Sequence, residues 1–438
     1  MSRADAVHDP YQALRYPQYR LYLLANQAMF WAYQIASLFL GALLYERTAS
    51  AWPLALVGLA NYLPIFLFTL PAGVLADDPR RQLYLRFTIS AQFLALAGLA
   101  YAVHVHAPLW AVYALVFAWS SARSVQTPLA VAFYPTLIPQ DAIANSVSWN
   151  SSNFMISAVL GPVVGGALAE TLGAEKAIAF ATLGPLFYFC VLLMIKPIRQ
   201  METRPNQDGI IQRVLGGWEY LKTEKAIRWA LTLDLIAALF GGCDALLPIF
   251  QKDILHVGLF ALGWLRAAIF LGSLLMSLWL AHKPLQNAGR SMFLAVGGFG
   301  LCMIVFALSH SFALSFLALF IAGVLDGVSV NVRQTLVQVR TPEHLRGRVQ
   351  AVNFMFIGSS NELGEVESAS LAGLVGPVFS VLFGGIITVG VVAWIYRIAP
   401  ELRLLGRLDR RHDELPAPVT AKDLETSETS SGGPHEAP

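Results

Sequence analysis

Twelve apolar segments, each about 20 residues or longer, dominate this 438-residue sequence. A helix needs roughly 20 mostly apolar residues to cross a bilayer, and such continuous segments are typical of helices rather than of alternating barrel strands. The sequence therefore predicts an all-α polytopic membrane protein with twelve transmembrane helices. The segments lie at about 20–44, 53–75, 84–105, 109–133, 145–169, 176–196, 227–250, 258–281, 291–309, 312–337, 348–368 and 373–396.

The composition supports this class of protein. Hydrophobic residues make up 56% of the chain and charged residues 13%, whereas soluble domains carry about 25% charged residues. The net charge of +2 argues against a nucleic-acid-binding protein, which would show a concentrated basic patch. The three cysteines lie far apart in apolar segments and form neither a disulfide framework nor a metal-binding spacing.

The distribution of basic residues predicts the orientation. Of the 30 lysines and arginines, 24 fall on the side that holds the N-terminus, three on the opposite side and three within spans. Because lysine and arginine concentrate in cytoplasmic loops, we expect both termini to be cytoplasmic.

The longest internal polar stretch separates six spans from six. We expect a cytoplasmic N-terminus (1–19), a six-helix bundle (20–196), a cytoplasmic linker (197–226), a second six-helix bundle (227–400) and a largely disordered tail (401–438). Apolar residues at helical spacing in the second part of the linker predict an amphipathic helix. It would lie either in the membrane interface or on the surface of the protein itself.

The two halves resemble each other at an offset of 203 residues. Residues 139–150 then align with 342–353, which pairs Pro139 with Pro342 and Asn150 with Asn353. Two parallel six-helix repeats are one of the architectures of transporters, in which the substrate binds between the halves near the midplane.

Several motifs resemble those of the major facilitator superfamily. They are GVLADDPRR at 73–81, Arg123 with Gln126 in the fourth segment, and SAVLGPVVGG at 157–166, which is similar to the antiporter motif. Asp78 and Thr127 depart from the family pattern. PTLIPQDAIANSVSWN and SNELGEVES are similar to sequences in the branch of enterobactin exporters and macrolide efflux pumps.

The resemblance implies an exporter in the bacterial inner membrane that works by alternating access and proton antiport. Its substrate would be an amphiphilic small molecule, such as a siderophore or a drug-like compound. It also implies gating roles for the residues of two motifs, which are Gly73, Asp77, Arg80 and Arg81 in the first and Gly161, Pro162, Gly165 and Gly166 in the second.

The first motif and the second suggest different gating contacts. In the superfamily the position of Asp77 contacts the other half, where Thr341 can cap a helix that begins at Pro342. The glycines and the proline of the second motif allow close helix approach and bending. Simple helix packing would use the same residues for the same physical reason.

Arg123 and Asp326 are candidate partners in a charge pair. They occupy equivalent positions in the two halves, about 21 Å from the outer ends of their spans. A charge at that depth is costly unless it is paired or hydrated. The pair would either open and close with proton or substrate binding or form a fixed salt bridge. Arg333 lies seven residues after Asp326, on the same helix face, and would exchange partners between conformations.

Other polar side chains are candidates for substrate binding. Trp119, Arg123 and Gln126 share one face of the fourth span, where an aromatic ring, a cation and an amide suit an aromatic or anionic ligand. For Trp119 ordinary packing is the alternative. Gln27 and Gln34 in the first span would line a cavity or form hydrogen bonds in the core.

Carboxylates within spans are candidates for proton coupling. Asp234 and Asp244 lie in the seventh span, about 80° apart around a continuous helix, so we expect them to act separately. In the superfamily this span lines the cavity. For Asp244 the alternative is a solvated group in the outer mouth. Asp234 and Asp326 are the first candidates for proton carriers.

The eleventh span contains Glu362, Glu365 and Glu367. These glutamates would bind protons or a cation. Alternatively, the span ends early and the glutamates are hydrated outside the membrane.

Two other functions remain to be weighed. One is an importer or a lipid transporter on the same fold. The other is a membrane-embedded enzyme, which is disfavoured because the sequence shows no nucleophile–base pairing, metal-ligand cluster or phosphate-binding loop. We expect no cofactor, no metal and no nucleic acid, and a monomer whose partners are a small-molecule substrate, protons and the lipid bilayer.

Overall fold

The computed structural model describes residues 9–76, 78–198, 210–283, 285–342 and 345–406. These residues form helices and no strand, which confirms the all-α prediction. The long helices of the first half are α1 (Pro17–Thr48), α2 (Trp52–Ala76), α3 (Arg81–His104), α4 (Leu109–Phe133), α5 (Ile143–Leu172), α6 (Ala174–Ala181) and α7 (Leu183–Met194). The second half contains α9 (Lys225–Gly241), α10 (Leu247–Ile249), α11 (Leu259–His282), α12 (Ala288–Leu308), α13 (Phe312–Arg340), α14 (Arg346–Val375), α15 (Pro377–Ile398) and α16 (Pro400–Arg403).

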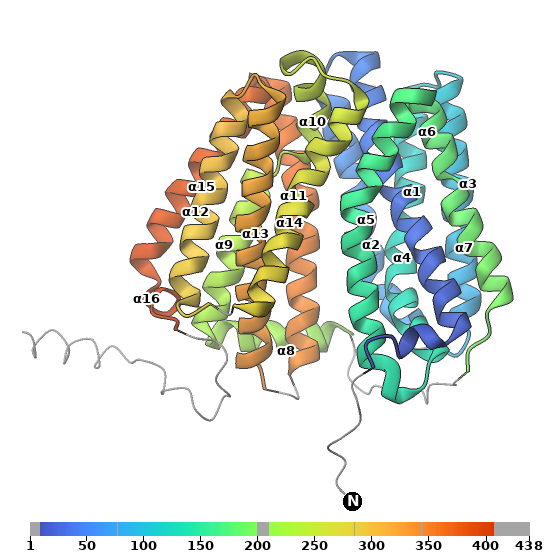
Figure 1. The fold of residues 1–438 in the computed structure, drawn as a ribbon, viewed down its shortest axis with the longest axis horizontal. Coiled ribbons are helices and arrows are strands. Elements are labelled where there is room, and N and C mark those ends of the chain that lie inside the picture. The colour runs from blue at the N-terminus through green and yellow to red at the C-terminus, as the bar shows by residue number, and fades with distance from the viewer. Residues whose placement is uncertain (1–8, 77, 199–209, 284, 343–344, 407–438) are drawn as a thin grey trace, which may run out of the picture.

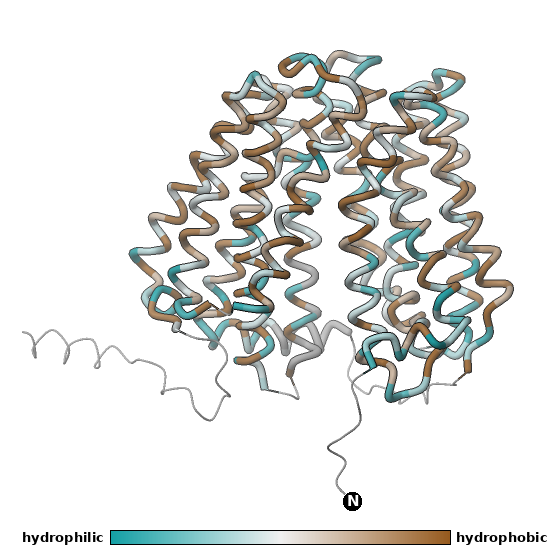
Figure 2. The backbone as a smooth tube through the Cα atoms, in the orientation of Figure 1, coloured by the Kyte–Doolittle hydropathy of each residue, from teal (hydrophilic) through white to brown (hydrophobic). Residues whose placement is uncertain are grey.

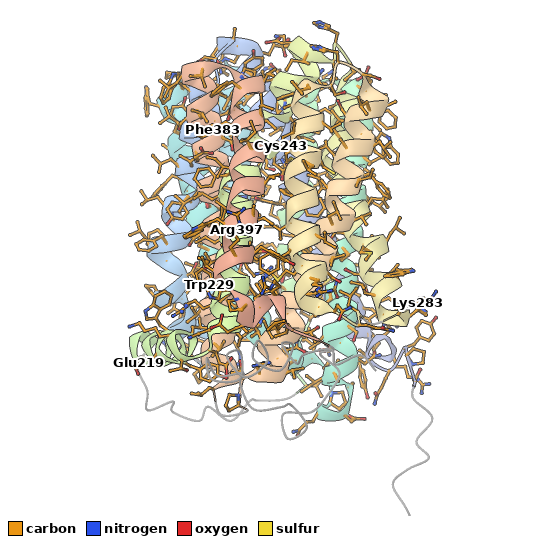
Figure 3. All side chains as sticks on the ribbon, turned by 90° about the vertical axis from the view of Figure 1, so that its left-hand side faces the viewer. Glu219, Trp229, Cys243, Lys283, Phe383 and Arg397 are labelled. Atoms are coloured by element: carbon orange, nitrogen blue, oxygen red, sulfur yellow. The ribbon has the colours of Figure 1, made fainter. Side chains whose placement is uncertain are left out.

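The helices form two bundles that stand side by side (Figure 1). Helices α1–α7 make one bundle and α9–α15 the other, and the helix α8 (Ile210–Thr223) lies across one end. We call this end the α8 end and the opposite one the far end. In Figure 3, Glu219 of α8 and Lys283 lie at the α8 end, whereas Cys243 and Phe383 lie nearer the far end.

Among the residues that the structure describes, ten helical segments are long and apolar enough to cross a membrane. Hydrophobic residues predominate along them in Figure 2. Helices α4 and α14, which are 25 and 30 residues long, complete the two bundles but are not among these ten. Both contain charged side chains within the helix, which are Arg123 in α4 and three glutamates in α14.

Helix α14 extends beyond the predicted eleventh span. We expected it to end at about 368 and the twelfth span to begin at about 373, but α14 continues to Val375 and α15 begins at Pro377. Gly376 separates them with a φ of 94°, a conformation that glycine adopts without steric strain. The glutamates therefore lie inside a helix rather than beyond its end.

At the far end the two halves are in close contact. Helix α5 packs along α11, and a Cβ on Gly263 of α11 would lie 2.3 Å from the carbonyl oxygen of Pro162 in α5. Two hydrogen bonds also cross here. The hydroxyl of Tyr45 donates to the carboxylate of Asp253, and the backbone N–H of Phe260 donates to the carboxylate of Glu170 at 3.2 Å.

Helix α8 is attached to the second half through Tyr220. Its hydroxyl donates a hydrogen bond of 2.6 Å to the carbonyl oxygen of Arg340, at the end of α13. Burial, with a contribution from the Glu224 carboxylate, raises the pKa of Tyr220 to about 12. The phenol therefore remains a donor well above neutral pH.

Replacing Tyr220 with phenylalanine is expected to lower the free energy of unfolding by about 0.5–1.5 kcal/mol, the usual value of one hydrogen bond. The loss should be present at neutral pH. It should disappear as the pH rises from about 10 to about 12, because the phenol of the unfolded wild-type chain ionises from about pH 10 and that of the folded chain only near pH 12. Thermal unfolding of both proteins in detergent at several pH values measures this. A constant difference up to pH 12 would contradict the assignment.

Candidate functional site

A cavity of about 460 Å³ lies between the two bundles. Residues from α1, α3, α4 and α5 line one side, and residues from α9 and α11–α14 line the other. Eight of the lining residues carry ionisable carboxyl or guanidinium groups. They are Arg123, Arg266, Arg333, Asp234, Asp244, Asp326, Glu362 and Glu365.

Arg123 links the two halves across this cavity. Its guanidinium lies 3.3 Å from the Glu362 carboxylate of α14 and 4.3 Å from the centre of the Tyr33 ring on α1. The predicted contact with Asp326 is wrong. Equivalent positions in the two halves do not pair here, and the arginine instead pairs with a glutamate of α14.

A second charge pair lies within the C-terminal half. The guanidinium of Arg333, which is 3% exposed, lies 3.2 Å from the Asp234 carboxylate and donates to the side-chain oxygen of Asn353 at 3.3 Å. Asp326 is within electrostatic range of both members of the pair. Among the residues that the structure describes, its carboxylate has no hydrogen bond or ion pair.

The polar side chains proposed for substrate binding divide into two groups. Gln34 and Gln126 line the cavity. Trp119 does not: it is buried behind Tyr33, with ring centres 5.7 Å apart. Gln27 donates to the hydroxyl of Ser157 at 2.7 Å and so forms a bond between α1 and α5. These contacts favour packing for Trp119 and core hydrogen bonding for Gln27.

The sequence reasoning did not select Arg266, and it assumed a continuous helix through Asp244. Helix α9 ends at Gly241, and a 3₁₀ turn (Asp244–Leu246) follows, so the continuous helix assumed for the seventh span does not exist. Asp244 consequently lines the same cavity as Asp234 instead of an outer mouth. Two consecutive glycines, Gly241 and Gly242, were the available signal for this break.

Arg266 of α11 is 9% exposed and faces the cavity. Its Nε and the Oδ1 of Asp244 are both buried without a hydrogen-bond partner in the described structure. An arginine inside a membrane span is a candidate functional residue by position alone, so Arg266 was recognisable from the sequence.

The glutamates of α14 have different environments. Glu362 and Glu365 line the cavity, whereas Glu367 does not. The hydroxyl of Ser368 donates to Glu367 at 3.3 Å. Glu362 and Glu365 therefore face the cavity between the halves.

The residues proposed for gating lie in two places. The motif at 157–166, which lies in α5, contacts α1 and α11. A Cβ on Gly161 would lie 2.9 Å from Gln34, and a Cβ on Gly166 would lie 3.0 Å from the backbone of Leu259. Pro162 contacts Gly263, and Gly165 lies against Ile35. Gly73, Arg80 and Arg81 lie around the α2–α3 connection at the other end, and Asp77 is outside the described residues.

The Arg123–Glu362 pair is expected to stabilise the contact between the halves by about 1.5–3 kcal/mol, the range for a hydrogen bond to a charged group. Replacing either residue by a neutral one, as in Arg123→Gln or Glu362→Gln, should lower the unfolding temperature in detergent. A double-mutant cycle measures the coupling directly. If the two substitutions are additive, the pair makes no energetic contribution.

The sequence matches the family described as "Transmembrane secretion effector" over residues 9–428. The chain is a member of this family, within the major facilitator superfamily. The members of this superfamily that it resembles are transporters and not enzymes. Among solved structures, the nucleoside transporter NupG matches with a TM-score of 0.69 and 12% identity, over 87% of this chain and 98% of NupG. A bacterial homologue of the human lysosomal transporter Spinster matches with a TM-score of 0.70 and 13% identity, over 91% of this chain and 98% of that structure.

Two relatives of this major facilitator protein are exporters. The multidrug efflux pump Tap of Mycolicibacterium fortuitum is 25% identical over 385 residues, which cover 83% of this chain and 92% of Tap. The enterobactin exporter EntS of Escherichia coli O1:K1 / APEC is 24% identical over 382 residues, which cover 86% of this chain and 88% of EntS.

Proposed function

We propose that this major facilitator protein exports an amphiphilic small molecule across the bacterial inner membrane in exchange for protons. In this proposal both termini and α8 are cytoplasmic, and the structure is the state closed toward the outside. A monomer is sufficient for the cycle, because one chain supplies both halves and all the groups that line the cavity.

The observation that carries the proposal is the combination of charges in a cavity between two closely packed halves. Asp326 faces the cavity without a hydrogen bond or ion pair in the described structure, beside the Arg333–Asp234 pair. Protonation removes the energetic penalty of an unpaired carboxylate at a poorly hydrated site. Arg333 is close enough to interact with both aspartates, so a proton on one of them changes which carboxylate it stabilises.

Export then follows from alternating access. In the cytoplasm-facing state the carboxylates release protons and the substrate enters the cavity. Opening toward the outside requires the far-end contacts to separate, among them the Tyr45–Asp253 and Phe260–Glu170 hydrogen bonds. Protons from outside then occupy the carboxylates, the substrate leaves, and the halves close again. The two exporters among the relatives support this direction.

Everted membrane vesicles test the proposal, because their interior corresponds to the outside of the cell. We expect an imposed acid-inside gradient to drive uptake of at least one compound from a panel of a dye, a macrolide and a catecholate siderophore. An uncoupler should abolish the uptake, and vesicles without the protein should show none. Uptake only in right-side-out vesicles would identify an importer and contradict the proposal.

A further inference from the structure

The two halves contribute different chemistry to the cavity. Seven of its eight ionisable residues belong to the second half, and Arg123 is the exception. The first half instead supplies four of the five amide side chains among the described lining residues, which are Asn26, Gln34, Gln92 and Gln126. Charged groups and neutral hydrogen-bonding groups therefore face the cavity largely from opposite sides.

Gln92 of α3 is the most deeply buried of these amides. It is 0% exposed and yet lines the cavity, so the cavity extends from the interface into the first bundle as far as α3. Helix α3 packs against α4 and α7 of its own half. Both the Oε1 and the Nε2 of Gln92 are buried without a hydrogen-bond partner in the described part of the chain.

A buried amide without a partner is costly to the fold. A buried donor or acceptor that forms no hydrogen bond is unfavourable, and the large majority of buried polar side-chain atoms have a partner. A methionine or leucine of similar volume would fill the same space without this cost. The two unpartnered atoms of Gln92 therefore point to a ligand that supplies an acceptor and a donor together.

The chemistry of the side chain defines the group that it binds. A glutamine amide presents an acceptor oxygen and N–H donors in one plane, so a second amide is its complement. A carboxylate offers acceptors only, and a guanidinium or an ammonium group offers donors only. Each of these would also bring an unpaired charge into a buried pocket, which is unfavourable. The complementary group is therefore uncharged.

We propose that Gln92 determines specificity by binding an uncharged carboxamide or lactam group of the exported molecule through two hydrogen bonds. This inference rests on the proposed function and specifies a substrate class, which is an aromatic compound with a neutral amide. The aromatic part packs against Phe30 and Phe154 of the first half. Their rings line the same cavity and lie 5.5 Å apart in an edge-to-face arrangement.

Two probes of the same shape test the proposal. Naphthalene-2-carboxamide carries the amide, and 2-acetylnaphthalene replaces its amino group by a methyl group and keeps only the acceptor. Isothermal titration calorimetry measures the Kd of each probe for the purified full-length protein in detergent. The ratio of the two Kd values is then compared between proteins, so that partition of the probes into detergent cancels.

Gln92→Met removes the hydrogen-bonding atoms from a side chain of nearly the same length. It should lower the preference for the amide over the ketone about 5- to 150-fold, because in the wild type the ketone leaves the Oε1 of Gln92 unpaired. Without a ligand, the unfolding temperature of Gln92→Met should equal or exceed that of the wild type, because no hydrogen bond of the fold is lost.

Gln82→Met is the matched control on the same helix. The amide of Gln82 donates to the carbonyl oxygens of Leu192 at 3.3 Å and Ile195 at 3.1 Å, and it does not line the cavity. This variant should lower the unfolding temperature and leave the ratio of the two Kd values unchanged.

Three results would overturn the inference: no binding of the amide by the wild type, an unchanged ratio in Gln92→Met, or a loss of stability in Gln92→Met that reveals a structural partner for the amide. The vesicle experiment distinguishes the failure of this inference from that of the proposed function. If a gradient drives uptake of a panel compound but any of these three results is found, only the substrate class is wrong. If Gln92 selects the amide but no gradient drives transport, the site exists and the export function is wrong.

Discussion

Asp326→Asn is expected to lower the steady-state accumulation of a transported compound about tenfold for each pH unit of the imposed gradient. Each coupled proton contributes about 1.4 kcal/mol per pH unit when the membrane potential is held at zero. Asparagine keeps the shape of the side chain but cannot carry a proton. Everted vesicles with valinomycin and equal potassium on both sides measure the accumulation at several gradients.

Two observations would show that Asp326 has another role. Accumulation that depends on the gradient as steeply as in the wild type would make the residue structural. Loss of transport together with loss of folded protein would also leave no evidence for a coupling role. Asp326→Glu then distinguishes a structural role of the residue from a role in proton coupling. Glutamate retains a titratable carboxylate, so it should recover a steeper dependence on the gradient than asparagine does.

Gly263→Val is expected to slow transport by preventing closure at the far end. Any Cβ at this position would lie 2.3 Å from the carbonyl oxygen of Pro162, and backbone atoms cannot move aside as a side chain does. Overpacking costs about 1–3 kcal/mol, which shifts an equilibrium between two conformations by about 5- to 150-fold. The initial rate of gradient-driven uptake should fall by a similar factor.

The shift of conformation has its own readout. Cys243 lines the cavity and is 2% exposed in this state. In a background with Cys190→Ser and Cys302→Ser, Gly263→Val should make Cys243 react faster with a membrane-impermeant maleimide added from the far side. Gly390→Val in α15 is the control, because a Cβ there would meet nothing within 4 Å. Equal reactivity in both variants would contradict the role of this contact.

The fold was predictable because length and apolarity determine which segments cross a membrane. The segment at 109–133, for example, coincides with α4. Charge within a span was equally informative: Arg123, Asp234, Asp326 and Glu362 were all selected from the sequence, and the structure places them around one cavity. That placement follows from the cost of burying a charge in lipid.

The pairing of these charges was not predictable from the sequence. Internal repeat symmetry placed Arg123 opposite Asp326, but the distance between two helices depends on how each half packs. Periodicity also failed at Asp244, where it assumed that a helix continues through two glycines. Tyr33 gave no signal, because an aromatic residue that covers an arginine is indistinguishable in sequence from one in the core.

The polarity of α4 and α14 has a consequence for the biogenesis of the protein. An arginine or an acidic residue at the centre of a helix opposes its partition from the translocon into lipid by about 2.5–3.5 kcal/mol. Neither helix is among the ten described helices that are apolar enough to cross a membrane, so α4 and α14 are expected to integrate alone less readily than those ten. Helix α4 packs against α2 and α3, which are synthesised before it, and α14 packs against α2 and α9. Their insertion is expected to depend on these earlier helices, so that the order of synthesis itself assists the assembly of the charged cavity.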